Sequence, residues 1–122
     1  MTAGSVNASL EAVVRLTVQG TRGQQEIEAV VDTGFSGYLT LPTPLIEALG
    51  LPPSGRGRAI LADGGEVSFN VHEAEVMWHE PPRRVFVAVA DTDPLVGMAL
   101  LYGQELKVQV VDGGGICIKA LP

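Results

Sequence analysis

The sequence predicts a single all-β domain with one or two short helices. Short runs of Val, Ile and Leu recur along the chain, several alternate with polar residues, and Gly- or Asp-rich turns separate them. Of the 122 residues, 46% are hydrophobic, which is enough for one core. We expect residues 1–9, which are small and polar, to be a flexible N-terminal tail, and residues 10–122 to form the domain.

The first elements expected are an antiparallel hairpin, a short strand and a helix. Residues 10–18 and 26–31 flank a turn containing Gly20 and Gly23, and the first run alternates in polarity as a half-buried strand does. A short strand is expected at residues 38–41. A helix follows, with Thr43 as its N-cap, Pro44 in its first turn and Gly50 at its end.

The second half of the chain is expected to add two hairpins and a strand that ends in glycine. Residues 59–62 and 66–77 surround Asp63-Gly64-Gly65, a strong hairpin signal. Residues 84–90 form a further strand. Leu95-Val96-Gly97 indicates a buried strand end, followed by a short apolar helical turn. Residues 106–111 and 115–118 then close the chain as a hairpin.

Composition excludes several function classes. A net charge of -6 and a pI near 4.7 argue against nucleic acid or an anionic membrane as the partner. The single Cys117 allows no intrachain disulfide and no thiolate cluster, and we expect it to be a buried or interface thiol. His72 and His79 have no partners at metal-ligand spacing, so no metal is expected. Without a signal peptide or an apolar run of about 18 residues, the expected location is cytoplasmic.

The chemistry of the chain is expected at Asp32. This acid directly follows the apolar run Ala29-Val30-Val31, and an ionised group at the end of a buried strand is costly unless it is compensated. Gly34 permits a tight turn after it, and hydroxyls from Thr33 and Ser36 can hold the carboxylate. Alone, this is an ordinary aspartate turn. A second hydrophobic segment that ends in glycine, Leu95-Val96-Gly97, follows about sixty residues later, and its presence favours a catalytic role for Asp32.

Two segments carry a resemblance to a known family: residues 30–37, Val-Val-Asp-Thr-Gly-Phe-Ser-Gly, and residues 95–101, Leu-Val-Gly-Met-Ala-Leu-Leu. In this order, separated by a helix and a hairpin, they resemble the single-domain retropepsin-like aspartic proteases, over residues 10–118. The resemblance implies a closed barrel equivalent to one half of a pepsin-type bilobal fold. It also implies a homodimer in which Asp32 of each copy shares one site, with residues 106–111 or 115–118 in the dimer sheet.

The implied reaction is endopeptidase hydrolysis of a peptide or protein substrate without metal or organic cofactor. One carboxylate takes a proton from water while the other polarises the scissile carbonyl, and two carboxylates about 3 Å apart share a proton. By the same resemblance, the remaining residues support the catalytic turn (Thr33, Gly34), bind substrate or form a flap over it (Phe35, Ser36, Ala62, Asp63, Gly64, Gly65), or pack behind the turn (Leu95, Val96, Gly97).

Two positions depart from the family pattern. Ala99 stands where relatives often carry a polar residue that braces the core, and Ser36 replaces an acid that binds substrate backbone in retroviral members. Two alternatives to a protease therefore stay open. One is a non-catalytic retropepsin-like module for peptide binding or dimerisation. The other is a monomeric β-domain in which Asp32 is only a turn residue.

Overall fold

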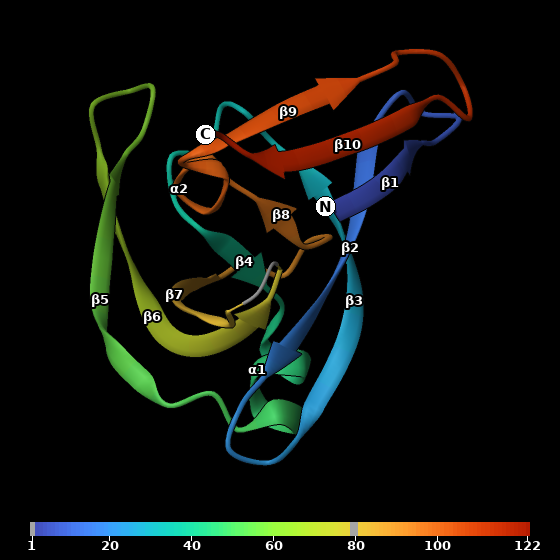
Figure 1. Cartoon of the computed structure of the whole chain (residues 1–122). Coiled ribbons are helices and arrows are strands. Elements are labelled where there is room, and N and C mark those ends of the chain that lie inside the picture. Colours follow the sequence, from blue (N-terminus) through green and yellow to red (C-terminus); the bar gives the residue numbers. More distant parts are fainter. Residues whose placement is uncertain (1, 79–80) are drawn as a thin grey trace.

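The computed structural model describes residues 2–78 and 81–122, so His79 lies outside the described part (Figure 1). Strands hold 53% of the chain and helices 9%, which confirms the all-β class expected from the sequence. The described residues form ten strands and two short helices. In chain order these are β1 Thr2–Val6, β2 Ala12–Gln19, β3 Gln24–Val31, β4 Leu39–Leu41, α1 Thr43–Leu49, β5 Pro53–Ile60, β6 Glu66–Met77, β7 Arg83–Val89, β8 Leu95–Val96, α2 Met98–Leu101, β9 Gln104–Val108 and β10 Gly115–Ala120.

All the strands belong to one sheet with the order β5-β6-β7-β4-β8-β3-β2-β1-β10-β9. The sheet curves strongly, and β2 also pairs with β6, where Val18 lies opposite Val76. Most neighbouring strands run antiparallel. The exceptions among the described pairs are β3 with β8 and β4 with β7, which run parallel. The centre of the sheet is therefore built from segments that lie far apart in the sequence.

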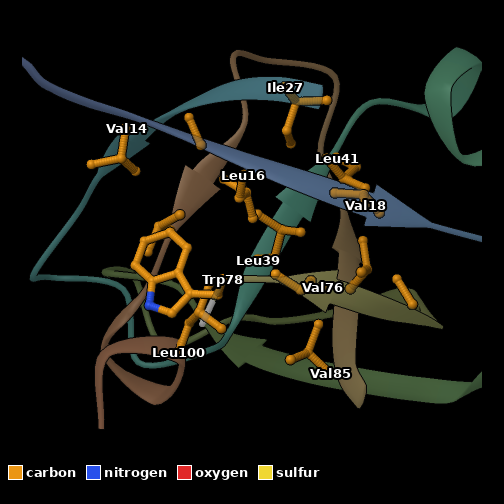
Figure 2. Close-up of a cluster of buried hydrophobic side chains, with 14 of the residues drawn as sticks. Val14, Leu16, Val18, Ile27, Leu39, Leu41, Val76, Trp78, Val85 and Leu100 are labelled. Atoms are coloured by element: carbon orange, nitrogen blue, oxygen red, sulfur yellow. The ribbon is translucent and has the colours of Figure 1, made fainter. Parts of the chain in front are cut away.

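The core fills the space inside this curve (Figure 2). Strand β2 shows why: Val14, Leu16 and Val18 are buried while Arg15 is exposed, so the alternation in sequence becomes one apolar and one solvated face. The largest fully buried side chains come from six of the strands, β2, β4, β6, β7, β8 and β10, and from helix α2, namely Val14, Val18, Leu39, Leu41, Val76, Val85, Val87, Val96, Leu100 and Ile118.

The N-terminal segment differs from the expected flexible tail. Thr2–Val6 forms β1, which pairs antiparallel with β10 on one side and with β2 on the other. A Cβ atom on Gly4 would lie only 2.1 Å from the carbonyl oxygen of Val13, so glycine permits this close approach. The segment is held by backbone pairing on both edges. Pairing through the backbone does not require alternating hydrophobic residues, so no such alternation in the sequence indicates this strand.

Helix α1 has the expected end but a different start. Gly50 adopts a left-handed φ of 64° and its N–H bonds back to the carbonyl of Glu47, as expected for a C-terminal glycine. The N-cap, however, is Pro42, with no side-chain capping bond, so the expected cap by Thr43 is wrong. The N–H of Thr43 instead donates to the Asp91 carboxylate at 3.1 Å, a contact from a distant loop.

Candidate functional site

Asp32 lies at the end of β3, at the first residue of a tight turn. Its side chain is half-buried, and its Oδ1 accepts a 2.9 Å hydrogen bond from the backbone N–H of Gly34. The carbonyl oxygen of Asp32 accepts a second bond, of 3.1 Å, from the N–H of Phe35. Thr33 and Ser36 are exposed, and no hydrogen bond from their hydroxyls to the carboxylate occurs among the described residues. The backbone, rather than these hydroxyls, holds the carboxylate.

Strand β8 lies directly beside the strand end that carries Asp32. Val30 and Val31 pair in parallel register with Leu95 and Val96, and the N–H of Asp32 donates to the carbonyl of Val96 at 2.9 Å. Val96 is fully buried behind the turn, whereas Leu95 is half-buried at its side. The structure therefore brings the two glycine-containing segments together, although about sixty residues separate them in the sequence.

Gly97 lets the chain after β8 pack against the Asp32 loop. Its N–H donates to Tyr38 O at 3.0 Å, and the next two amides, of Met98 and Ala99, donate to the carbonyls of Phe35 and Gly37 at 2.8 and 3.1 Å. A Cβ atom on Gly97 would lie 2.2 Å from the Gly37 oxygen. At Ala99, therefore, a backbone N–H braces the loop in a place where a polar side chain is absent.

Thr40 is a supporting residue that sequence reasoning missed. It is the one buried polar residue among the described side chains, 6% exposed, and its Oγ1 accepts the N–H of Leu95 at 2.9 Å. This bond links β4 to β8 immediately behind the Asp32 loop. The sequence feature that could have identified Thr40 is a hydroxyl between Leu39 and Leu41. A polar side chain in a fully buried strand needs a hydrogen-bond partner.

A hollow of about 490 Å³ opens beside Asp32. Its wall is mainly aliphatic and includes exposed side chains, with Leu10 at 63% and Val110 at 68% exposed. Glu11 is the other acidic residue in the wall, and no Lys or Arg lines it among the described residues. The full lining is Val6, Leu10, Glu11, Ala12, Val30, Val31, Asp32, Leu95, Val108 and Val110.

A second, smaller pocket of about 120 Å³ lies further along the loop, at Phe35. Tyr38 and Phe86 form part of it, with their rings in an edge-to-face arrangement 6.3 Å apart. Its wall is apolar and comes from the Asp32 loop, β4, β6 and β7, namely Phe35, Gly37, Tyr38, Leu39, Phe69, Val71, Phe86 and Ala88. Hydrophobic hollows therefore border the loop at two places, at Asp32 and at Phe35.

The β5–β6 hairpin extends past the body of the molecule, as Figure 1 shows. At its tip, Asp63 Oδ1 accepts the N–H of Gly65 at 2.8 Å, and Gly64 adopts a positive φ of 86°. The tip residues Ala62–Gly65 line neither of the hollows beside the Asp32 loop, whereas Phe69, further down β6, lines the pocket at Phe35. Thus the body of the hairpin, not its tip, reaches the site in this structure.

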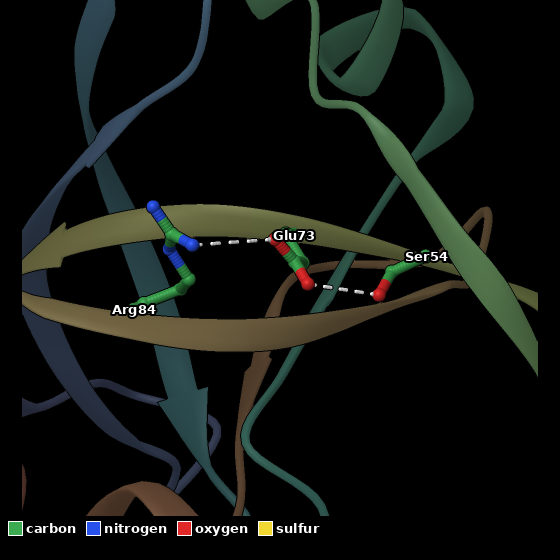
Figure 3. Close-up of polar contacts among 3 residues, drawn as sticks. All are labelled: Ser54, Glu73 and Arg84. Atoms are coloured by element: carbon green, nitrogen blue, oxygen red, sulfur yellow. Dashed lines mark hydrogen bonds and ion pairs between the residues drawn. The ribbon is translucent and has the colours of Figure 1, made fainter.

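The base of this hairpin is joined to the neighbouring strand by a polar cluster (Figure 3). Glu73 accepts a 3.0 Å hydrogen bond from the Ser54 hydroxyl, and its other carboxylate oxygen lies 4.0 Å from the Arg84 guanidinium. Ser54 is the second residue of β5, the outer strand of the hairpin, while Arg84 belongs to β7. Glu73 therefore connects the outer strand to the body of the sheet.

Within residues 2–78 and 81–122, no group of three or more His, Cys, Asp and Glu side chains is arranged to hold a metal ion. His72 is half-buried, and its Nδ1 lies 3.0 Å from the carbonyl oxygen of Leu51. Cys117 is half-buried in β10. No helix in the described part of the chain is long and apolar enough to cross a membrane.

Neither models of known protein families nor curated proteins give a match to this chain.

Proposed function

We propose that this protein is a retropepsin-like aspartic endopeptidase that acts as a homodimer. The observation that carries the proposal is the half-buried Asp32 carboxylate on a glycine turn that is bonded, through Val96 and Gly97, to a distant strand end. An ordinary surface turn needs no such support. The pairing of β2 with β6, which brings the sheet back toward itself, also supports the proposed closed barrel.

The homodimer follows from the chemistry of peptide hydrolysis. One carboxylate must accept a proton from the attacking water while another donates to or polarises the scissile carbonyl. Asp32 is the one acid on this loop, and the other acid in the adjoining hollow, Glu11, bonds instead to the Asn7 side chain at 3.0 Å. A second copy of Asp32 supplies the missing carboxylate, and the two share a proton.

The substrate is proposed to be an extended peptide with apolar side chains near the scissile bond. An extended chain points alternate side chains to opposite sides, and two apolar hollows border the Asp32 loop, at Asp32 and at Phe35, where such side chains can bind. The pocket at Phe35, about 120 Å³, is smaller than the cavity of about 150 Å³ that accommodates a benzene ring. We therefore expect it to take an aliphatic side chain in preference to an aromatic one.

The test is digestion of a peptide library from acid to neutral pH by the wild-type chain and by Asp32→Asn. Cleavage by the wild type, its loss in the variant and its block by a statine-type inhibitor are expected. Glu47→Gln, the same carboxylate-to-amide change on the exposed face of α1, serves as the matched control and should cleave normally. Cleavage that survives Asp32→Asn would contradict the proposal, as would a wild type inactive under all conditions.

A further inference from the structure

Among the strands that the structure describes, none pairs with β9 on the side away from β10, so this edge is open. The sheet ends at β9, whereas β10 is flanked on both sides, by β1 and β9. The N–H of Gln109 donates to Gly115, and the carbonyl of Gly103 accepts from Leu121, so odd-numbered residues direct their backbone groups toward β10. The backbone groups of Leu106 and Val108 therefore face the open edge, because the direction alternates along a strand. This edge can accept one more strand.

We infer that the added strand is β9 of a second copy, paired antiparallel about a two-fold axis at Leu106. In this register the two Leu106 residues exchange both backbone hydrogen bonds. Glu105 of each copy then lies opposite Lys107 of the other, which gives two pairs of opposite charge. Both side chains are exposed on one face of β9, while Leu106 and Val108 point to the core. Opposite charges in directly facing positions stabilise a strand pair.

Charge favours this register over pairings that are centred on the adjacent residues of β9. Centring the pairing on Glu105 or on Lys107 would place two identical charges opposite each other. Centring it on Val108 would place Lys107 opposite Gln109, with no charge pair. Glu105 also lies 3.5 Å from Lys119 of the adjacent β10, so the proposed pairing extends an existing row of alternating charge. The Leu106 register is thus the one in which both charged residues of β9 find opposite partners.

The location of β9 connects this edge to the proposed active site, and in this respect the inference rests on the proposed function. Val108, at the end of β9, lines the same hollow as Asp32. The second copy is therefore added to a strand whose end borders the incomplete site. The same hollow contains the exposed side chains of Leu10 and Val110, and exposed apolar surface of this kind is typical of an interface.

The experiment measures association by sedimentation equilibrium without substrate, for the wild type, Glu105→Lys, Lys107→Glu and an equimolar mixture of the two variants. Each variant alone should associate roughly ten- to thirtyfold more weakly, because both facing pairs become repulsive. The mixture should return to within about threefold of the wild type, since only the mixed dimer has opposite charges at both pairs. Arg56→Glu, on the opposite edge strand β5, is the matched control and should associate like the wild type.

A wild type that is monomeric at every concentration would overturn the inference. So would variants that associate normally, as expected if Lys107 only guards the edge, or a mixture no stronger than its components. Circular dichroism of each variant separates misfolding from lost association. Assaying peptide cleavage by the wild type and by Asp32→Asn beside this series separates the two proposals: rescue by mixing in a chain whose wild type cleaves no peptide supports the interface alone, whereas Asp32-dependent proteolysis without rescue supports the enzyme alone.

Discussion

The backbone N–H of Asp32 donates to the carbonyl oxygen of Val96 at 2.9 Å, so the residue that carries the carboxylate also makes the last hydrogen bond between the β3 and β8 segments. The position of the turn is consequently set by the strand beside it. The side chains of Thr33 and Ser36, both exposed, contribute little to that position. Changes behind the loop should therefore affect the site more than changes on its surface.

Gly97→Ala should destabilise the protein by about 1–3 kcal/mol, because the added methyl group has no room. It would meet the backbone oxygens of Gly37 and Phe35 at 2.2 and 2.8 Å, and these atoms belong to the Asp32 loop itself. Urea denaturation measures the loss. Gly115→Ala is the control, since its nearest neighbour is a flexible side chain at 3.4 Å, and it should cost about 0.5 kcal/mol or less. Equal losses would contradict the packing argument.

Thr40→Val should cost about 1–3 kcal/mol, because the N–H of Leu95 loses its acceptor within the sheet. Thr40→Ser keeps the hydroxyl and loses only a methyl group, worth about 0.8 kcal/mol. Amide hydrogen exchange distinguishes the two variants more directly than total stability. The Leu95 amide should remain protected in Thr40→Ser and exchange faster in Thr40→Val; equal protection in both would show that the hydroxyl is not the acceptor that matters.

Asp91→Ala should destabilise helix α1 by about 1 kcal/mol, since it removes the acceptor for the first helical N–H. Thr43→Ala should have almost no effect, because the Thr43 side chain makes no capping bond. Thermal unfolding of both variants compares the contributions. The reverse order, with the larger loss at Thr43, would restore the N-cap that the local sequence suggests.

Glu73→Ala should loosen the base of the β5–β6 hairpin by about 1 kcal/mol, through loss of the Ser54 hydrogen bond. Glu73→Gln retains an oxygen acceptor for Ser54 and loses only the contact with Arg84, which is 4.0 Å long and has an exposed guanidinium. Its cost should be about 0.5 kcal/mol or less. Hydrogen exchange across residues 53–77 is the measurement. Equally fast exchange in Glu73→Gln and Glu73→Ala would assign the main role to the contact with Arg84, which both variants lose.

The elements that the sequence predicts well are those whose signals are local. Alternation of Val14, Leu16 and Val18 with polar residues marks β2, and Asp63-Gly64-Gly65 marks the turn between β5 and β6. Strand β1 has neither signal, because its order comes from pairing with two other strands on both edges. The start of α1 was missed for a related reason: its acceptor, Asp91, is 48 residues away.

In the candidate site too, the local features could be predicted from the sequence and the long-range contacts could not. Asp32 and Gly34 form a local turn, and their motif could be found in the sequence. The place of Leu95, Val96 and Gly97 beside that turn was expected only from a family resemblance. The bond from Leu95 to Thr40 spans 55 residues, and no periodic pattern encodes such a contact. The side-chain supports of the loop therefore required the three-dimensional structure.

The parallel pairing of β3 with β8 also has a consequence for how the protein is made. Closing a long loop costs entropy before its contacts form, so pairings between distant segments are late and slow steps in folding. During synthesis the Asp32 loop leaves the ribosome well before Leu95 and Val96, which must then pair with it. A nascent or truncated chain that ends before Leu95 consequently exposes the acid without its ordered surroundings. The order of translation thus delays assembly of the site until most of the protein exists.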